Sequence, residues 1–123
     1  MATWHIELIG DPGAVVVRIE GSIANHDAMD AAHRTGALLR DASMPMEVCI
    51  DLRTMADYTV SAREHWAQVL KQHKAKIRLL TWVTTKSTHR MVGRAVGLFS
   101  GLTTRLLDEL PHEYALGPSL SPR

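Results

Sequence analysis

The chain contains only one cysteine, one phenylalanine and two tyrosines among its 123 residues. The single cysteine, Cys49, excludes an intrachain disulfide and any zinc cluster built from several cysteines. No window holds the roughly 18 apolar residues that a membrane-spanning helix needs. The first ten residues also lack the long apolar run of a secretory signal. A cytoplasmic location is therefore the expectation.

The short motifs of nucleotide and metal chemistry are missing as well. No Gly-x-Gly-x-x-Gly follows the first expected strand and no Walker motif occurs, so a nucleotide cofactor has no support. The histidines form no His-x-x-x-His pair and no HExxH helix. We therefore expect no metal site and no cofactor, and single histidines spread over the surface: His5, His26, His33, His65, His73, His89 and His112.

What the sequence does contain is enough apolar material for one globular domain. Hydrophobic residues make up 46% of the chain and the formal net charge is +1. The charges are unevenly placed, because residues 65–107 carry eight Lys or Arg and no acid. This stretch either presents a basic surface to an anionic partner or pairs with acids of the N-terminal half. The second interpretation is the simpler one, and we expect no binding of DNA or RNA.

Hydrophobic periodicity predicts the element order β-β-α-β-α-β-α. Strands are expected at residues 4–9, 14–20, 47–52 and 77–84. Helices are expected at 25–41 and 61–76, and from about 87 towards 107 with a break at Ser100 and Gly101.

This order predicts an α/β fold. The Gly10-Asp11-Pro12-Gly13 turn joins the first two strands into a hairpin. The later strands each follow a helix, which requires crossover connections and parallel neighbours. We therefore expect a mixed, mostly parallel four-stranded sheet covered by helices, over residues 1–110, with a loosely ordered tail at 111–123.

The segment after the third strand holds the candidate polar site. Residues 53–60 are expected to form a loop flanked by Asp51 and Asp57. Ser61 and Glu64 have the spacing of a capping box, in which the serine caps the next helix and the glutamate reaches back to it. The two aspartates are expected to bind backbone N–H groups, since no third ligand or base stands nearby.

One stretch of this region resembles a known family. Residues 49–62, which read CIDLRTMADYTVSA, resemble the central part of STAS domains, namely the SpoIIAA-type anti-sigma factor antagonists and their SEC14-like bacterial relatives. Asp51 and Leu52 match the end of the family's buried strand, and Ser61 falls where the antagonists carry a phosphorylatable serine. The antagonists have Asp-Ser-Ser-Gly at this place, whereas this chain has Thr59-Val60-Ser61-Ala62.

The resemblance implies a non-enzymatic regulatory module of bacterial signalling. Its partner would be a protein, such as a kinase-like anti-sigma factor, and Ser61 would be the phosphoacceptor. As a plain helix cap, Ser61 would instead contribute about 0.5–2 kcal/mol of stability. The predicted partner-binding loop comprises Asp51, Asp57, Tyr58, Thr59 and Ser61.

The last predicted helix supports an alternative function. Gly93, Gly97 and Gly101 recur every four residues, although each glycine inside a helix costs about 1 kcal/mol relative to alanine. The glycines either allow close packing or make the helix a lid, with Arg90 and Arg94 facing an anion.

The lid interpretation corresponds to a carrier or sensor of an apolar or anionic lipid-like ligand, as the SEC14-like relatives imply. A third hypothesis is a small hydrolase built around Ser61, or around Asp51 and Asp57, which needs these groups to converge with a base. Self-association into a homodimer stays open.

Overall fold

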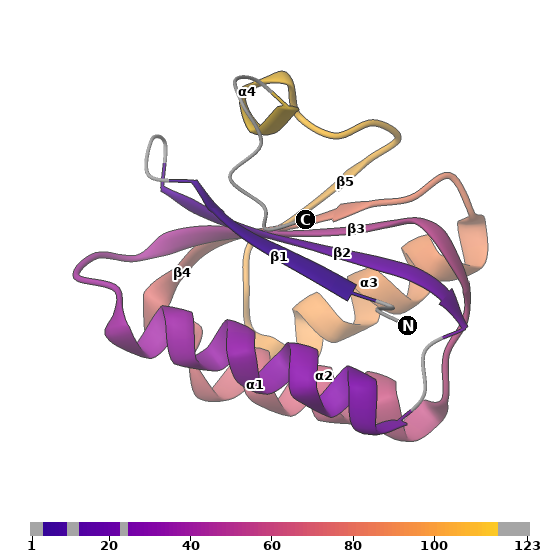
Figure 1. Ribbon diagram of the computed structural model, residues 1–123, viewed down its shortest axis with the longest axis horizontal. Helices are drawn as coiled ribbons and strands as arrows, with labels where there is room; N and C mark the ends of the chain where they lie inside the picture. The colour runs from indigo at the N-terminus through magenta and orange to yellow at the C-terminus, as the bar shows by residue number, and fades with distance from the viewer. Residues whose placement is uncertain (1–3, 10–12, 23–24, 116–123) are drawn as a thin grey trace.

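A five-stranded sheet runs through the computed structural model, which describes residues 4–9, 13–22 and 25–115 (Figure 1). The strand order is β1-β2-β3-β4-β5. β1 and β2 are antiparallel, and the other neighbouring pairs are parallel. The strands are β1 (Trp4–Ile9), β2 (Ala14–Ser22), β3 (Met46–Asp57), β4 (Ile77–Val83) and β5 (Thr104–Leu107).

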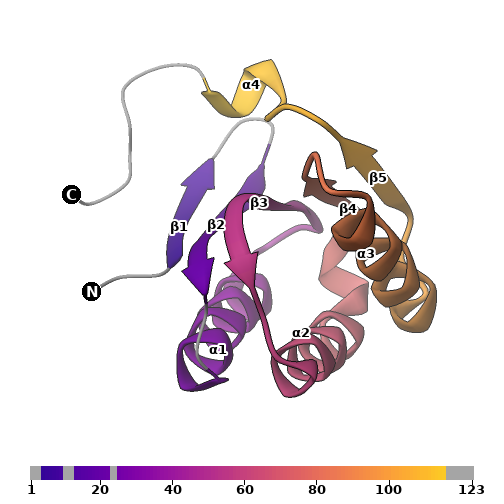
Figure 2. The ribbon, with the colours of Figure 1, turned by 90° about the vertical axis from the view of Figure 1, so that its right-hand side faces the viewer.

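Three helices connect the parallel strands in turn: α1 (Asn25–Asp41), α2 (Val60–Gln72) and α3 (Ser87–Ser100). Each crossover adds the next strand on the same side of the last one, and crossovers of one hand then place all helices on one face. Figure 2 shows α1, α2 and α3 against one face of the curved sheet. The short helix α4 (His112–Ala115) lies over the other face (Figure 2).

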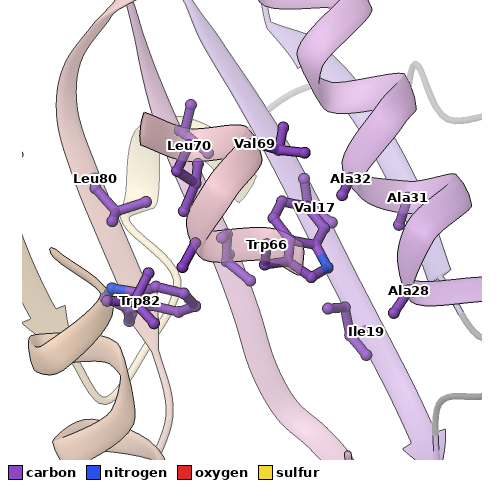
Figure 3. Close-up of a cluster of buried hydrophobic side chains, with 14 of the residues drawn as sticks. Val17, Ile19, Ala28, Ala31, Ala32, Trp66, Val69, Leu70, Leu80 and Trp82 are labelled. Atoms are coloured by element: carbon purple, nitrogen blue, oxygen red, sulfur yellow. The ribbon is translucent and has the colours of Figure 1, made fainter. Parts of the chain in front are cut away.

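The main core lies between the sheet and these three helices. The face of α1 towards the sheet is built from alanines, with Ala28, Ala31 and Ala32 each at most 1% exposed, so this helix packs closely (Figure 3). α2 contributes the larger side chains Trp66 and Leu70 to the same core. A fully buried side chain of this size stabilises the fold by about 1.5–3 kcal/mol.

A second, smaller cluster occupies the opposite face of the sheet. It consists of Ala14, Val16, Cys49, Val83 and Tyr114. Tyr114 belongs to α4, falls within the predicted tail and is only 5% exposed. Residues 116–123 of that tail lie outside the described part of the chain.

The predicted α/β architecture with its N-terminal hairpin is confirmed, but the sheet has five strands instead of four. The last helix does not continue towards residue 107, because Gly101 adopts a left-handed conformation with φ 71° and ends α3. The chain then returns as β5, which pairs in parallel with β4. The predicted loop at 53–60 is also wrong for most of its length, since β3 continues to Asp57.

Candidate functional site

The polar residues that the sequence singled out after β3 lie at one edge of the sheet. Because β2, β3 and β4 are parallel, the helices that follow them all begin at their carboxyl ends. We call this the carboxyl edge; α2 begins there at Val60 and α3 at Ser87 (Figure 1). Lys86 Nζ donates to the Met55 carbonyl oxygen at 2.9 Å and ties the start of α3 to the end of β3.

Thr59, and not Ser61, caps α2. Thr59 has extended backbone angles, and its Oγ1 accepts a hydrogen bond from the Ala62 N–H at 3.0 Å. The predicted capping box is therefore wrong, because the N-cap lies two residues earlier than the Ser61–Glu64 pattern requires. Ser61 lies exposed in the first turn of the helix.

Tyr58 connects this turn to α3. Its ring packs edge-on against His89, with ring centroids 5.7 Å apart and planes at 66°. Asp57 is the last residue of β3, and its side chain lies outside the described structure. Tyr58, Thr59 and Ser61 thus lie together at the carboxyl edge.

Asp51 lies elsewhere. It sits inside β3, 2% exposed, and alternates with Ile50 and Leu52, which face the helices. Its carboxylate therefore points to the opposite face of the sheet and does not converge with Ser61.

Two arginines hold the Asp51 carboxylate. Arg53 donates from Nε at 3.0 Å, from Nη2 at 2.9 Å and from its backbone N–H at 3.1 Å. Arg18 Nε lies 3.6 Å away on β2. Burial by itself would raise the pKa of the Asp51 carboxyl, but the hydrogen bonds from Arg53 and the charges of both arginines outweigh it and hold this pKa below its ordinary value.

The glycines of α3 lie against the sheet. A Cβ at Gly93 would be 2.8 Å from Trp82 Cγ, and a Cβ at Gly97 would be 2.0 Å from Thr104 Oγ1. Of the two arginines predicted to meet an anion, Arg90 forms an ion pair with Asp108 beyond β5, and Arg94 is exposed.

A small cavity of about 60 Å³ lies between the sheet and the starts of α2 and α3. Its walls are apolar except at Tyr58, Arg63 and His89. The apolar lining comes from every layer of the core: Ile19, Ala28, Ile50, Leu52, Met55, Ala62, Trp66, Trp82, Val92, Gly93 and Val96.

Two tryptophans of this lining carry buried polar atoms. The indole nitrogens of Trp66 and Trp82 have no hydrogen-bond acceptor among the described residues. They lie on opposite outer sides of the ring pair in Figure 3. Each unsatisfied buried donor costs about 1–3 kcal/mol. No local sequence pattern indicates the cavity, because its walls come from six separate elements.

The structure also brings together two histidines that the sequence places far apart. Nε2 of His33 on α1 lies 3.3 Å from Nε2 of His65 on α2. Their spacing of 32 residues follows no metal or catalytic motif.

No helix in the described ranges is both long and apolar enough to cross a membrane. No protein-family model matches the chain, and no curated protein matches its sequence.

Comparison of the fold with solved structures, in contrast, finds a similar protein. It is the crystal structure of an uncharacterized protein from the DUF3478 family with a SpoIIAA-like fold, from Shewanella loihica PV-4. The two structures align with a TM-score of 0.69 over 89% of this chain and 88% of that chain, at 12% sequence identity. At this sequence identity the similarity shows a shared fold, and a shared fold by itself does not imply a shared activity. The chain therefore has a SpoIIAA-like fold.

Proposed function

We propose that this protein is a non-enzymatic regulatory module of STAS type that binds a partner protein in the cytoplasm of a bacterial cell. The partner surface comprises the start of α2 and the outer face of α3. Phosphorylation of Ser61 would control the complex, and a kinase-like anti-sigma factor is the partner class that the STAS resemblance suggests.

The observation that carries the proposal is the exposed apolar surface of α2 and α3, the two helices that begin at the carboxyl edge. Seven large hydrophobic side chains are exposed among the described residues, and four of them lie on α2 and α3: Val60, Met91, Leu98 and Phe99. A groove between the two helices is lined by Met91, Val92 and Phe99 along with Arg63 and Glu64. Exposed apolar surface with a polar rim is typical of protein-binding sites.

The position of Ser61 suits regulation by phosphate. Its side chain is exposed in the first turn of α2, where free backbone N–H groups and the helix dipole stabilise negative charge. A phosphoserine there would carry between one and a half and two negative charges, at roughly neutral pH, two residues before Arg63, which lines the groove. The added charge would weaken the binding of a partner protein that buries this groove.

Site-specific photo-crosslinking in the native host tests the partner surface. A crosslinker at Met91 is expected to capture one defined protein. The matched control is Met44, which is the same residue type and equally exposed at 70% but precedes β3. Equal capture from both positions, or none from Met91, would overturn the proposed surface.

Intact-mass and phosphopeptide measurements test the switch. We expect phosphate on Ser61 in protein isolated from the host, lost in Ser61→Ala and kept in Ser87→Ala. Ser87 is the matched control, because it is an exposed serine in the first turn of α3. If crosslinking from Met91 changed between growth conditions while Ser61 stayed unmodified, control of the complex by phosphorylation of Ser61 would be contradicted.

A second candidate function is carriage of an apolar, lipid-like ligand, and the mostly apolar lining of the cavity favours it. Ligand pockets usually measure about 300–1,000 Å³, so α3 would have to move away from α2 to admit a lipid. Arg63 at the cavity wall would then meet an acidic head group.

Binding of a fluorescent fatty acid tests this candidate. Val92→Phe adds volume at the cavity wall and is expected to abolish binding, whereas Met91→Phe adds the same ring type on the exposed side and is expected to keep it. Equal binding by both variants, or no binding by the unaltered protein, would exclude a carrier that uses this cavity.

A further inference from the structure

His33 and His65 form a close pair across two helices. Their Nε2 atoms lie 3.3 Å apart, and their rings meet edge-on with centroids 5.0 Å apart and planes at 64°. His33 is exposed on α1 and His65 is half-buried on α2. The pair is therefore open to solvent and to small ions.

The separation of the two nitrogens fits two ligands of one tetrahedral zinc ion. Zinc binds imidazole nitrogen at about 2.0–2.1 Å, and a tetrahedral angle between two such bonds places the nitrogens about 3.3–3.4 Å apart. A right angle, as in a square-planar copper site, would place them about 2.8–3.0 Å apart. The observed 3.3 Å equals the tetrahedral value and is also the length of a hydrogen bond between the two ring nitrogens, which a metal ion would replace.

The backbone holds the two histidines at this distance. One turn further along α1, Gly36 lets the helices approach closely, because a Cβ there would lie 2.9 Å from His73 Nε2 and 3.4 Å from Val69 Cγ1. His73 and Val69 follow His65 on the α2 side of the contact. A metal ion would thus find both ligands in place and would need little rearrangement of the backbone.

No group of three or more histidine, cysteine or acidic side chains that could hold a metal occurs within the described residues. The two remaining positions of a tetrahedral ion would be filled by water. Such a site binds metal reversibly and leaves the ion open to a further ligand.

We propose that His33 and His65 bind a zinc ion that joins α1 to α2. His65 follows Ser61 by one helical turn on α2, whereas neither histidine lines the cavity. The zinc proposal is argued from the geometry of the histidine pair and does not depend on the function proposed above. Its occupancy would strengthen the contact between the two helices and would follow the zinc available to the protein.

Isothermal titration of the full chain with zinc chloride tests the site. We expect one ion per chain, release by EDTA and a higher thermal midpoint with zinc present. His33→Ala and His65→Ala are each expected to weaken binding about tenfold or more, since even the loss of an outer-shell partner commonly costs about 10–100-fold.

His26→Ala is the matched control, because His26 lies on α1 with its side chain 82% exposed and pairs with its neighbour Asp27. It should bind zinc like the unaltered chain. Circular dichroism establishes that each variant is folded. No zinc binding by the unaltered chain, or equal binding by folded His33→Ala and His65→Ala, would overturn the proposal.

Discussion

Gly97 of α3 lies directly against Thr104 of β5, so that a Cβ at position 97 would stand 2.0 Å from Thr104 Oγ1. Gly93 has the same relation to the ring of Trp82 one turn earlier. Glycine in a helix interior costs about 1 kcal/mol relative to alanine, and the close approach of α3 to the sheet explains why glycine occupies these positions despite that cost. The glycine spacing thus has a packing role whether or not α3 moves in function.

Gly97→Ala is expected to lower the free energy of unfolding by about 1–3 kcal/mol, because the new methyl group overlaps Thr104. Urea denaturation measures the change. In a Thr104→Ala background the same substitution should cost less, since the overlapping hydroxyl is gone. Stabilisation by Gly97→Ala in the unaltered background would mean that α3 does not rest on β5 as described.

Thr59→Ala is expected to destabilise the protein by about 1 kcal/mol, because the Ala62 N–H loses its side-chain acceptor. Ser61→Ala is the matched control and should change stability by less than about 0.5 kcal/mol, as is usual for an exposed side chain. Chemical denaturation of both variants compares them. A larger loss from Ser61→Ala would restore the capping box that the sequence suggested.

The element order could be predicted because each element carries its own periodic pattern. The fifth strand could not, because Thr104–Leu107 has only four residues and follows an apolar helix without a long interruption. Its identity depends on the left-handed Gly101 and on pairing with β4, which no local pattern encodes. The two-residue error in the N-cap of α2 has a similar origin, since Thr59 and Ser61 are both good capping residues and tertiary packing decided between them.

The candidate site could likewise be predicted only where its residues are adjacent in the chain. Residues adjacent in the chain, such as Tyr58, Thr59 and Ser61, stayed together, whereas strand alternation turned Asp51 to the opposite face. The cavity and the pair of His33 and His65 arise from contacts between distant segments, which the spacing of residues within the sequence does not indicate.

Cys49 is expected to be inert towards thiol reagents in the folded protein. It is fully buried, and burial together with the nearby Asp51 carboxylate raises the pKa of its thiol to about 12. At about pH 8 almost no reactive thiolate is present, so labelling with an aromatic disulfide reagent should follow unfolding of the chain. Rapid labelling in guanidinium is the control, and rapid labelling of the native protein would contradict the buried placement.

Asp51→Asn is expected to lower the free energy of unfolding at neutral pH by about 1–3 kcal/mol, because Arg53 and Arg18 lose a charged partner. The pKa of Asp51 is lower in the folded state than the ordinary value of 3.8. The ionised carboxylate therefore stabilises the fold fully above about pH 4, and this stabilisation is lost as the pH falls through the lower pKa of the folded state.

The difference between Asp51→Asn and the unaltered protein should accordingly be constant from about pH 7 to pH 5 and narrow below about pH 4. Denaturant titrations across this range measure it. Asp41→Asn is the matched control, because Asp41 pairs with Arg40 with its side chain 71% exposed, and such surface pairs contribute at most about 1 kcal/mol. A difference for Asp51→Asn that widened on acidification would mean that the carboxyl is favoured in its protonated form in the fold, contrary to the hydrogen bonds that Arg53 donates to it.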